Sequence, residues 1–170
     1  MRSLTISVHE AGDKMAGSLS RGGRLFLCGN GGSAAAAQHI AAEMTGRFVK
    51  DRRPLAAIAL TTDTSAITAI ANDYGYEQVF ARQLWALGKP DDCLVVLSTS
   101  GNSLNVLAAV NRARSIGMPV IGLLGRMGGT IGRFCDTAIL VPSDVTARIQ
   151  EAHEFIGHAL CAHIEAALGL

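Results

Sequence analysis

Residues 25–45 read LFLCGNGGSAAAAQHIAAEMT, and this stretch decides the fold. It opens with a short apolar run, Leu25 to Cys28, which is typical of a buried β-strand. A glycine-rich turn, Gly29 to Ala34, comes next, and the segment from Ser33 to Thr45 has the length of a helix. A strand that passes through a glycine turn into a helix is the first half of a βαβ unit.

The same alternation of short apolar runs and longer segments continues along the whole chain. Four further strands are predicted at Ala56 to Leu60, Cys93 to Leu97, Val120 to Leu124 and Ala138 to Val141. Helices are predicted within Ile6 to Leu19 and over Thr64 to Ala71, Glu77 to Leu87, Ser103 to Ile116, Gly129 to Phe134 and Thr146 to Leu168. We therefore expect one doubly wound α/β domain over residues 1–170, with five parallel strands and helices on both faces, as in flavodoxin-like folds.

Composition excludes several classes of protein. The 170 residues are 49% hydrophobic and 17% charged, which excludes a disordered chain, and the net charge of +1 argues against a nucleic-acid partner. No apolar run reaches the roughly 18 residues of a membrane span, and the first residues do not resemble a signal peptide, so we expect a cytoplasmic protein. The basic cluster of Arg47, Lys50, Arg52 and Arg53 is interpreted as a solvated loop.

The cysteines point to neither disulfides nor a thiolate metal site. The sequence contains four of them, Cys28, Cys93, Cys135 and Cys161, without a CxxC pair. The first three lie in or beside apolar runs, where a reduced thiol packs as a small hydrophobic group.

The turn after the first strand, GNGGSA, predicts a site for a phosphate or a sugar. Glycines allow the backbone to approach a ligand, and the first N–H groups of the following helix favour an anion. Gly29, Gly31 and Ala34 also match the dinucleotide pattern G-x-G-x-x-A, so a nicotinamide-dependent oxidoreductase is one alternative. That pattern requires an acidic residue at the end of the second strand, and Asp63 lies too far along the chain. A glycine turn without any ligand is the other alternative.

A second polar turn, STSGNS, follows the third strand. Ser98, Thr99, Ser100 and Ser103 provide four hydroxyl groups at the start of a predicted helix, with Gly101 allowing the tight turn. No lysine of the Walker type accompanies them, so the turn favours the monophosphate of a metabolite over a nucleoside triphosphate. The alternative is that Ser103 is only a helix cap and that the other residues form a polar loop.

Two predicted helices carry groups that could hold a metal ion or move protons. His39 and Glu43 are four residues apart, and therefore lie on one face of their helix. The last helix contains RIQEAHEFIGH, in which spacing alone favours Glu154 with His158, because Gln150 and His158 are separated by about 12 Å of helix rise. His9 and His163 have no evident partner in the sequence and are interpreted as surface or packing residues.

Four segments together resemble the phosphoheptose isomerase family, whose members have the sugar isomerase (SIS) fold. They are GNGGSAAAAQHIAAEMTGRF, TAIANDYGYEQVFARQLWALG, LSTSGNSLNVLAAV and TARIQEAHEFIGHALC, in the order found in that family. The resemblance extends from about Gly23 to Leu168. Other SIS proteins share the STSGNS turn, whereas its combination with AQHIAAE and RIQEAH is typical of this family.

The resemblance implies an enzyme that converts sedoheptulose 7-phosphate to D-glycero-D-manno-heptose 7-phosphate, the first step towards the heptose of bacterial lipopolysaccharide. It implies Zn²⁺ as cofactor and a homotetramer with active sites at the subunit interfaces. We assign the role of base to Glu43 and that of acid to His158. The zinc ligands that it implies are His39, Glu43, Gln150 and His158. The substrate-binding residues that it implies are Asn30, Gly31, Gly32, Glu43, Asn72, Asp73, Ser98, Thr99, Ser100, Ser103 and Gln150.

This sequence departs from the family pattern at two places. Ala36 stands where members commonly have Asp, and only 28 residues precede Gly29, so residues 1–22 form a shorter N-terminal helix region than is usual. The alternative within the same fold is a non-catalytic sugar-phosphate-binding protein, like the relative that associates with the replication initiator DnaA. That relative lacks the glutamate of the metal site, so Glu43 together with His158 argues against this alternative.

Overall fold

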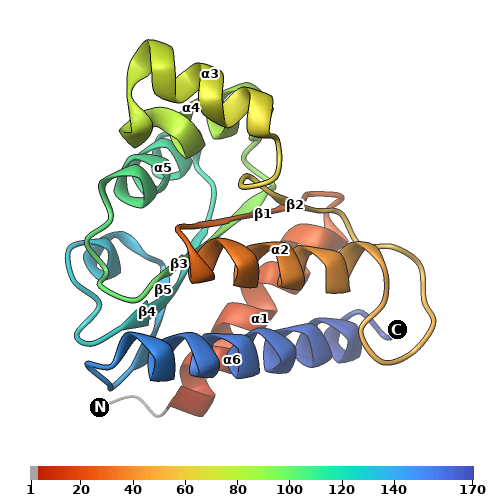
Figure 1. Cartoon of the computed structure of the whole chain (residues 1–170). Helices are drawn as coiled ribbons and strands as arrows, with labels where there is room; N and C mark the ends of the chain where they lie inside the picture. Colours follow the sequence, from red (N-terminus) through yellow and green to blue (C-terminus); the bar gives the residue numbers. More distant parts are fainter. Residues whose placement is uncertain (1–3) are drawn as a thin grey trace.

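A five-stranded parallel sheet forms the centre of the computed structural model, which describes residues 4–170 (Figure 1). The strand order is β2-β1-β3-β4-β5, and every neighbouring pair is parallel. The strands are β1 (Leu25–Gly29), β2 (Ala57–Ala59), β3 (Cys93–Ser98), β4 (Val120–Gly125) and β5 (Thr137–Val141). Each lies where the apolar runs predicted it, which confirms the predicted fold class.

Helices connect the strands and precede the first of them. They are α1 (Leu4–Ser20), α2 (Gly32–Thr45), α3 (Thr64–Tyr74), α4 (Val79–Leu87), α5 (Leu104–Ile116) and α6 (Thr146–Ala167). Two short 3₁₀ turns, η1 (Tyr76–Gln78) and η2 (Ile131–Phe134), take the place of helix that was predicted near Glu77 and Gly129. Helix α3 runs three residues beyond the predicted Ala71 and stops at Gly75, whose positive φ of 86° ends the helical path.

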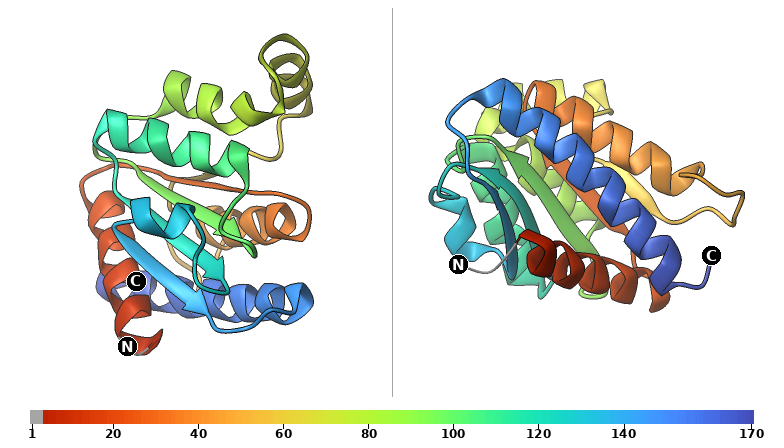
Figure 2. Two further views of the ribbon diagram at one scale, coloured as in Figure 1. Left: turned by 90° about the vertical axis from the view of Figure 1, so that its left-hand side faces the viewer. Right: turned by 90° about the horizontal axis from the view of Figure 1, so that it is seen from below.

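The helices form two layers, one on each face of the sheet (Figure 2). Helices α1, α2 and α6 pack on one face, around a core that includes Met15, Ile40 and Leu160. Helices α4 and α5 pack on the other face around Phe26 and Leu84, with α3 placed outside them. Because both faces are covered, strands β1, β3 and β4 are buried along their whole length.

The carboxyl ends of β1 and β3 lie side by side in the middle of the sheet. Gly29 of β1 pairs with Leu97 of β3, and the connections from these two strands leave towards opposite edges of the sheet. A side chain at Gly29 would meet the Leu97 carbonyl oxygen at 2.9 Å and Ser33 Cβ at 2.8 Å, so only glycine fits this turn. Ligands of doubly wound sheets bind at such a reversal of strand order.

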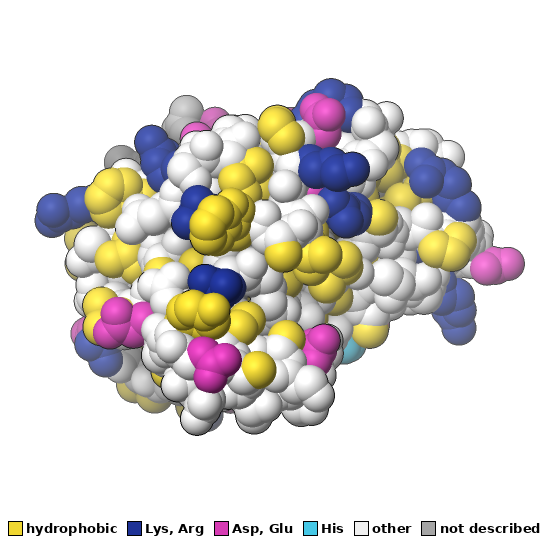
Figure 3. Space-filling view, turned by 90° about the horizontal axis from the view of Figure 1, so that it is seen from above, with side chains coloured by type: hydrophobic (Ala, Val, Ile, Leu, Met, Phe, Trp, Pro, Cys, Tyr) yellow, Lys and Arg dark blue, Asp and Glu magenta, His cyan; other side chains and the backbone are white. Residues whose placement is uncertain are grey.

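The outer surface of α3 and α4 mixes apolar and cationic side chains (Figure 3). Arg82 stacks on the ring of Tyr74 at 3.6 Å, and Arg112 stacks on the ring of Trp85 at 4.4 Å. Both aromatic residues are exposed. Stacking of this kind lets an exposed ring keep an apolar contact without joining the core.

The basic cluster is only partly the solvated loop that the sequence predicted. Arg47, Lys50 and Arg53 are exposed, as expected. Arg52 contradicts the prediction, because its side chain is 2% exposed and pairs with Glu165 of α6. Charge patterning along a sequence does not reveal a partner that lies 113 residues away.

The cysteines are free and mostly buried, as the sequence interpretation of reduced thiols packed in apolar surroundings predicted. All four are free, and only Cys135 is not fully buried. Burial raises the pKa of Cys93 to about 12, which leaves a neutral thiol at physiological pH. None of the helices within residues 4–170 combines the length and the apolar character needed to cross a membrane.

Candidate functional site

The STSGNS turn forms a compact polar loop between β3 and α5. Ser98 Oγ accepts a hydrogen bond from Gly101 N at 3.1 Å and lies 3.2 Å from Ser103 Oγ. Ser103 occupies the N-cap position of α5, but its side chain does not cap the helix, contrary to the alternative that it serves only as a cap. The Ser103 hydroxyl leaves the start of α5 uncapped, but Val106 N already donates to Asn105 Oδ1 at 2.9 Å, so the N–H groups of Leu104 and Asn105 are those that can meet an anion.

A hydrogen-bonded pair of asparagines joins the two predicted binding turns. Asn30 Nδ2 donates to Asn105 Oδ1 and Asn105 Nδ2 donates to Asn30 Oδ1, both at 2.8 Å. Tyr76 Oη, which lies outside the chain segments of both turns, donates to Asn30 Oδ1 at 3.2 Å. Asn105 is 4% exposed, and the sequence analysis did not single it out. The sequence did contain a signal for Asn105: it is a polar residue inside the first turn of a predicted helix, next to the STSGNS motif.

Helices α2 and α6 pack closely against each other along the metal and proton-transfer residues. Gly157 of α6 has no side chain where a Cβ would meet Ile40 Cδ1 of α2 at 2.7 Å. Near the start of α2, a Cβ at Gly32 would lie 2.5 Å from Gln150 Nε2. These two contacts align α2 and α6 in the same direction, so residues of α2 meet residues of α6 in register (Figure 1).

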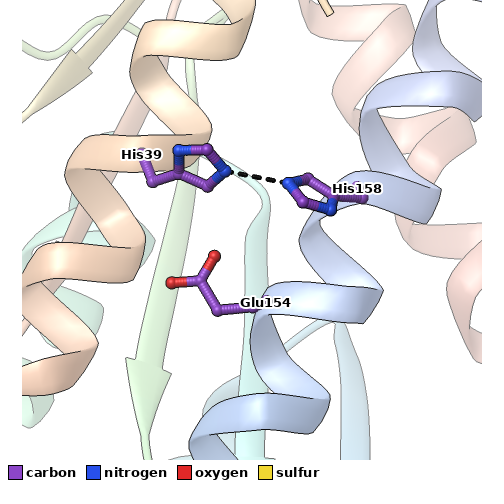
Figure 4. Close-up of side chains that lie close together, drawn as sticks. All are labelled: His39, Glu154 and His158. Atoms are coloured by element: carbon purple, nitrogen blue, oxygen red, sulfur yellow. Dashed lines mark hydrogen bonds between the residues drawn. The ribbon is translucent and has the colours of Figure 1, made fainter.

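This alignment brings His39 of α2 to His158 of α6. Their Nε2 atoms are 2.8 Å apart, so one ring carries the proton that the other accepts. Glu154, one turn before His158, turns its carboxylate towards both rings, and the three ligand atoms lie within 4.8 Å of one another (Figure 4). Glu43 Oε1 lies 3.7 Å from His39 Nε2. Two imidazoles and two carboxylates therefore meet where the two helices face each other.

The residues of this cluster suit a divalent metal ion. Neutral imidazole nitrogens and carboxylate oxygens are ligands of such ions, and two helices hold them in place. Two nitrogens bound to one zinc-sized ion in a tetrahedral site lie about 3.3 Å apart, so the observed 2.8 Å needs only a small rotation of one ring. Phe48 stacks on His158 with the ring centroids 5.4 Å apart and limits that ring's movement. The side chain of His39 is 42% exposed, which leaves room for an incoming ligand.

The structure does not bring every predicted site residue to this place. Gln150 is on α6, about two turns before His158. Its side chain lies against the first turn of α2, beside the Asn30 to Gly32 turn. Asn72 and Asp73 lie at the end of α3, where Asn72 Nδ2 donates to Asp73 Oδ1 at 2.8 Å. Asp73 also lines a hollow with Tyr74 and Arg82 on the outside of the helical layer.

His9 and His163 have partners that the sequence did not reveal, although packing is one of the two roles that the sequence interpretation gave them. His163 Nε2 is 2.7 Å from Asp13 Oδ1, and the ring of His9 meets that of His163 edge-on with centroids 5.0 Å apart. These contacts link α1 to α6 and involve neither of the binding turns. Packing between the first and last helices explains both histidines.

Comparison with known proteins agrees with the geometry. A family model described as the SIS domain matches residues 2–125. The phosphoheptose isomerase of Rhodospirillum rubrum is 52% identical, over 95% of this chain and 86% of that protein. The chain belongs to the phosphoheptose isomerase family.

Two solved structures of the phosphoheptose isomerase family have the same fold. That from Neisseria gonorrhoeae has a TM-score of 0.91 and 49% identity, and covers 97% of this chain and 88% of its own. That from Francisella tularensis has a TM-score of 0.93 and 43% identity, with the same coverage. Gln150, Glu154 and His158 lie beyond the residues matched by the SIS model, on a helix that these longer comparisons include.

Proposed function

We propose that this protein is an aldose–ketose isomerase that converts sedoheptulose 7-phosphate to D-glycero-D-manno-heptose 7-phosphate. The observation that carries the proposal is the meeting of His39 with His158 at 2.8 Å, beside Glu43 and Glu154. Relatives at about half identity over most of the chain are named phosphoheptose isomerases, which supports this substrate. The reaction would begin the synthesis of the heptose found in bacterial lipopolysaccharide.

The substrate phosphate would bind at the STSGNS turn. Ser98, Thr99, Ser100 and Ser103 offer hydroxyl groups there, and the first N–H groups of α5 add a favourable dipole. The turn Asn30 to Gly32 would contact the sugar chain, with Asn30 held by Asn105. Gln150 reaches the same turn, which supports a role in substrate binding. Asn72 and Asp73 would have to approach the substrate from α3, or from α3 of a neighbouring subunit.

Glu43 and His158 would move the two protons that the reaction requires. Exchange of a ketose with an aldose removes a proton from C1 and returns it to C2, through an enediol. The Glu43 carboxylate would accept the proton from C1 and deliver it to C2. His158 would transfer the hydroxyl proton between O1 and O2, and the C2 carbonyl would become a hydroxyl group. No net proton is gained or lost in the cycle.

We further propose a zinc site made of His39, Glu43, Gln150 and His158, with Glu154 as a further carboxylate facing it. Gln150 lies about two turns of α6 before His158, so its side chain would have to lean towards the cluster to bind the ion. Its donors are nitrogen and oxygen atoms without cysteine, which is typical of catalytic rather than structural zinc. Zinc held there would polarise the carbonyl and the adjacent hydroxyl of the sugar. The protein residues would orient the sugar so that C1 lies near the Glu43 carboxylate.

The first test is turnover of sedoheptulose 7-phosphate by the purified protein, followed by NMR of the aldose product. We expect turnover that a chelator abolishes and that added zinc restores. If the zinc-loaded protein gives no product but still binds a sugar phosphate, the result would favour the non-catalytic SIS-domain alternative. If no turnover occurs but reduced nicotinamide binds, the result would favour the oxidoreductase.

We also propose that the protein is a homotetramer with active sites at its interfaces. An apolar groove of about 600 Å³ lies between α1 and α6, lined in part by Val8, Ile156 and Ala159. Phe155 lines the same groove and is 75% exposed, although it is next to Glu154 in the sequence. Exposed apolar surface of this kind is typical of a protein interface. F155E should lower the mass measured by light scattering and reduce turnover, whereas an unchanged mass would argue against this interface.

A further inference from the structure

Arg52 lies in the loop after α2, and its guanidinium is buried where α2 ends. Its side chain is 2% exposed and makes hydrogen bonds to two different elements. Nη2 donates to the carbonyl oxygen of Glu43 at 2.8 Å, and Nη1 donates to that of Met44 at 2.8 Å. Nη1 also approaches the carbonyl oxygens of Gly46 at 3.3 Å and Arg53 at 3.2 Å. One guanidinium thus donates hydrogen bonds to the carbonyl oxygens at the end of α2.

These carbonyls would otherwise lack partners within the helix. The last four carbonyl groups of an α-helix have no N–H group ahead of them, and a cation at that end also opposes the helix dipole. Arg52 meets both needs at Glu43, and at Met44 it shares the carbonyl oxygen with Leu55 N, which donates to it at 2.9 Å. The backbone of Glu43, the proposed base, is therefore held directly by Arg52.

The same guanidinium also binds α6. Arg52 Nε donates to Glu165 Oε1 at 2.7 Å, and the Glu165 side chain is 9% exposed. Glu165 lies seven residues after His158, two turns further along the same face of α6. Between them, Cys161 has its pKa raised to about 12 by burial, with Glu43 and Glu165 adding to the effect and Arg52 opposing it. The four side chains consequently share one buried region at the end of α2.

The contacts between α2 and α6 thus bracket the cluster of His39, Glu43, Glu154 and His158. Gly32 with Gln150 lies on one side, Ile40 with Gly157 lies at its centre, and Arg52 with Glu165 lies on the other side. Of these contacts, only Arg52 with Glu165 is an ion pair with several hydrogen bonds. A metal site shared by two helices depends on their spacing, because the ligand atoms must converge within tenths of an ångström.

We propose that Arg52 is a positioning residue, which joins the end of α2 to Glu165 of α6 and thereby sets the distance between Glu43 and His39 on one helix and His158 on the other. This inference rests on the proposed function. It adds to that function a buried cation that touches neither substrate nor metal. Replacement of Arg52 is expected to change metal affinity and kcat, because both depend on the convergence of the two helices. It should change KM much less, because the phosphate site lies on another loop.

The decisive variant is R52M/E165M, which removes both charges and keeps similar side-chain volume. Replacement of a whole buried ion pair by apolar residues is tolerated far better than removal of one partner. We expect a folded protein with a lower thermal midpoint, because methionine cannot donate to the carbonyl at Glu43, together with zinc affinity weakened about tenfold or more in competition with a chromophoric chelator and kcat reduced about ten- to a hundredfold. KM should change by less than about threefold. If the pair variant does not fold, R52K decides instead: its ammonium cannot reach Glu165 and both carbonyls, so we expect zinc binding about threefold weaker.

Arg24→Met is the matched control. Arg24 pairs with Asp92 at 3.1 Å at the amino ends of the central strands β1 and β3, and the side chain of Asp92 is 2% exposed. R24M should lower the thermal midpoint while zinc affinity and kcat stay within about twofold of the wild type. R53M changes an exposed side chain in the same loop as Arg52, and it should change neither zinc affinity nor kcat.

Two outcomes separate the inference from the proposed function. If R52M/E165M loses thermal stability but keeps zinc affinity and kcat within about threefold, Arg52 is only a structural residue and the inference is wrong. If the wild-type protein binds zinc but does not turn over the sugar phosphate, the proposed function fails. The zinc-affinity measurement still tests the inference in that case, because weaker zinc binding by R52M/E165M supports the positioning role without any measurement of turnover.

Discussion

The two helical layers cover the same sheet but are built differently. In the layer made of α1, α2 and α6, which we call the inner layer, α2 buries six residues, among them Ile40 and Met44, and α6 buries a further eight. In the layer on the other face, which we call the outer layer, α4 and α5 also bury residues against the sheet, but α3 lies outside them and buries none fully. Only half-buried side chains of α3, such as Ile67 and Ile70, pack towards the core. Both layers carry residues that the sequence assigns to the site.

This difference suggests a division of labour. His39 and Glu43 lie on the open side of a helix whose other side is firmly packed, which suits groups that must meet a reacting atom accurately. Asn72 and Asp73 lie on a helix with few buried contacts, and elements of that kind open or shift at low cost. We expect the inner layer to carry the chemistry and the outer layer to contact the substrate.

The largest expected effect separates Glu43 from Asp73. E43Q should lower kcat by about 10²- to 10⁴-fold, because an amide cannot accept the proton from C1. D73N should raise KM several-fold and change kcat little, because it removes a contact rather than a reacting group. Steady-state kinetics of both variants decide this. Near-normal turnover in E43Q, or an equal loss of kcat in D73N, would contradict the division between layers.

Truncation of one isoleucine in each layer measures the difference in packing. I40A removes a side chain that is 1% exposed and wedged against Gly157, so it should cost about 2–5 kcal/mol of unfolding free energy. I70A truncates a half-buried side chain of α3 and should cost about 1 kcal/mol or less. Urea unfolding followed by circular dichroism gives both values. Equal losses would mean that α3 is as well packed as α2.

Within α6, zinc titration compares Gln150 with Glu154. We expect Q150A to weaken zinc affinity about tenfold, as for loss of a ligand or its support, and E154A to weaken it by less than about threefold. Glu154 is partly exposed and can return to water when zinc binds through other groups. The reverse order would place Glu154, which already faces His39 and His158, among the zinc ligands in place of Gln150.

The smallest expected effect concerns His153, which lies on the buried side of α6. Burial lowers its pKa from 6.5, and the nearby backbone of Leu124 offsets this only in part. The unfolded chain therefore binds more protons than the folded one below pH 6.5, so stability is complete above that pH and falls as the pH drops towards the folded-state pKa. Between pH 7.5 and 5.5, H153Q should lose about 1 kcal/mol less than the wild type. Parallel losses in both proteins would exclude His153 as the source.

Local patterns in the sequence predicted the fold nearly completely. The apolar runs placed all five strands, because a strand buried on both faces needs a continuous apolar segment whatever its neighbours are. Helix ends were less well predicted. The end of α3 depended on the conformation of Gly75, and the 3₁₀ turn at η1 depended on how Tyr76 reaches Asn30. Such ends depend on contacts that a local pattern does not contain.

For the site, the sequence by itself determined which chemical groups are available and on which turns and helices they lie. It indicated the glycine and serine turns from their local chemistry, whereas His39, Glu43 and His158 were implied as a site by the resemblance to the family, because their spacing alone is more common in surface or core pairs. Only the tertiary structure decided which of them meet. It brought His39 to His158 across 119 residues, joined Asn30 to Asn105, and buried Arg52 against Glu165. The physical reason is that helix and strand periods act over a few residues, whereas distances between helices are set by packing across the whole sheet.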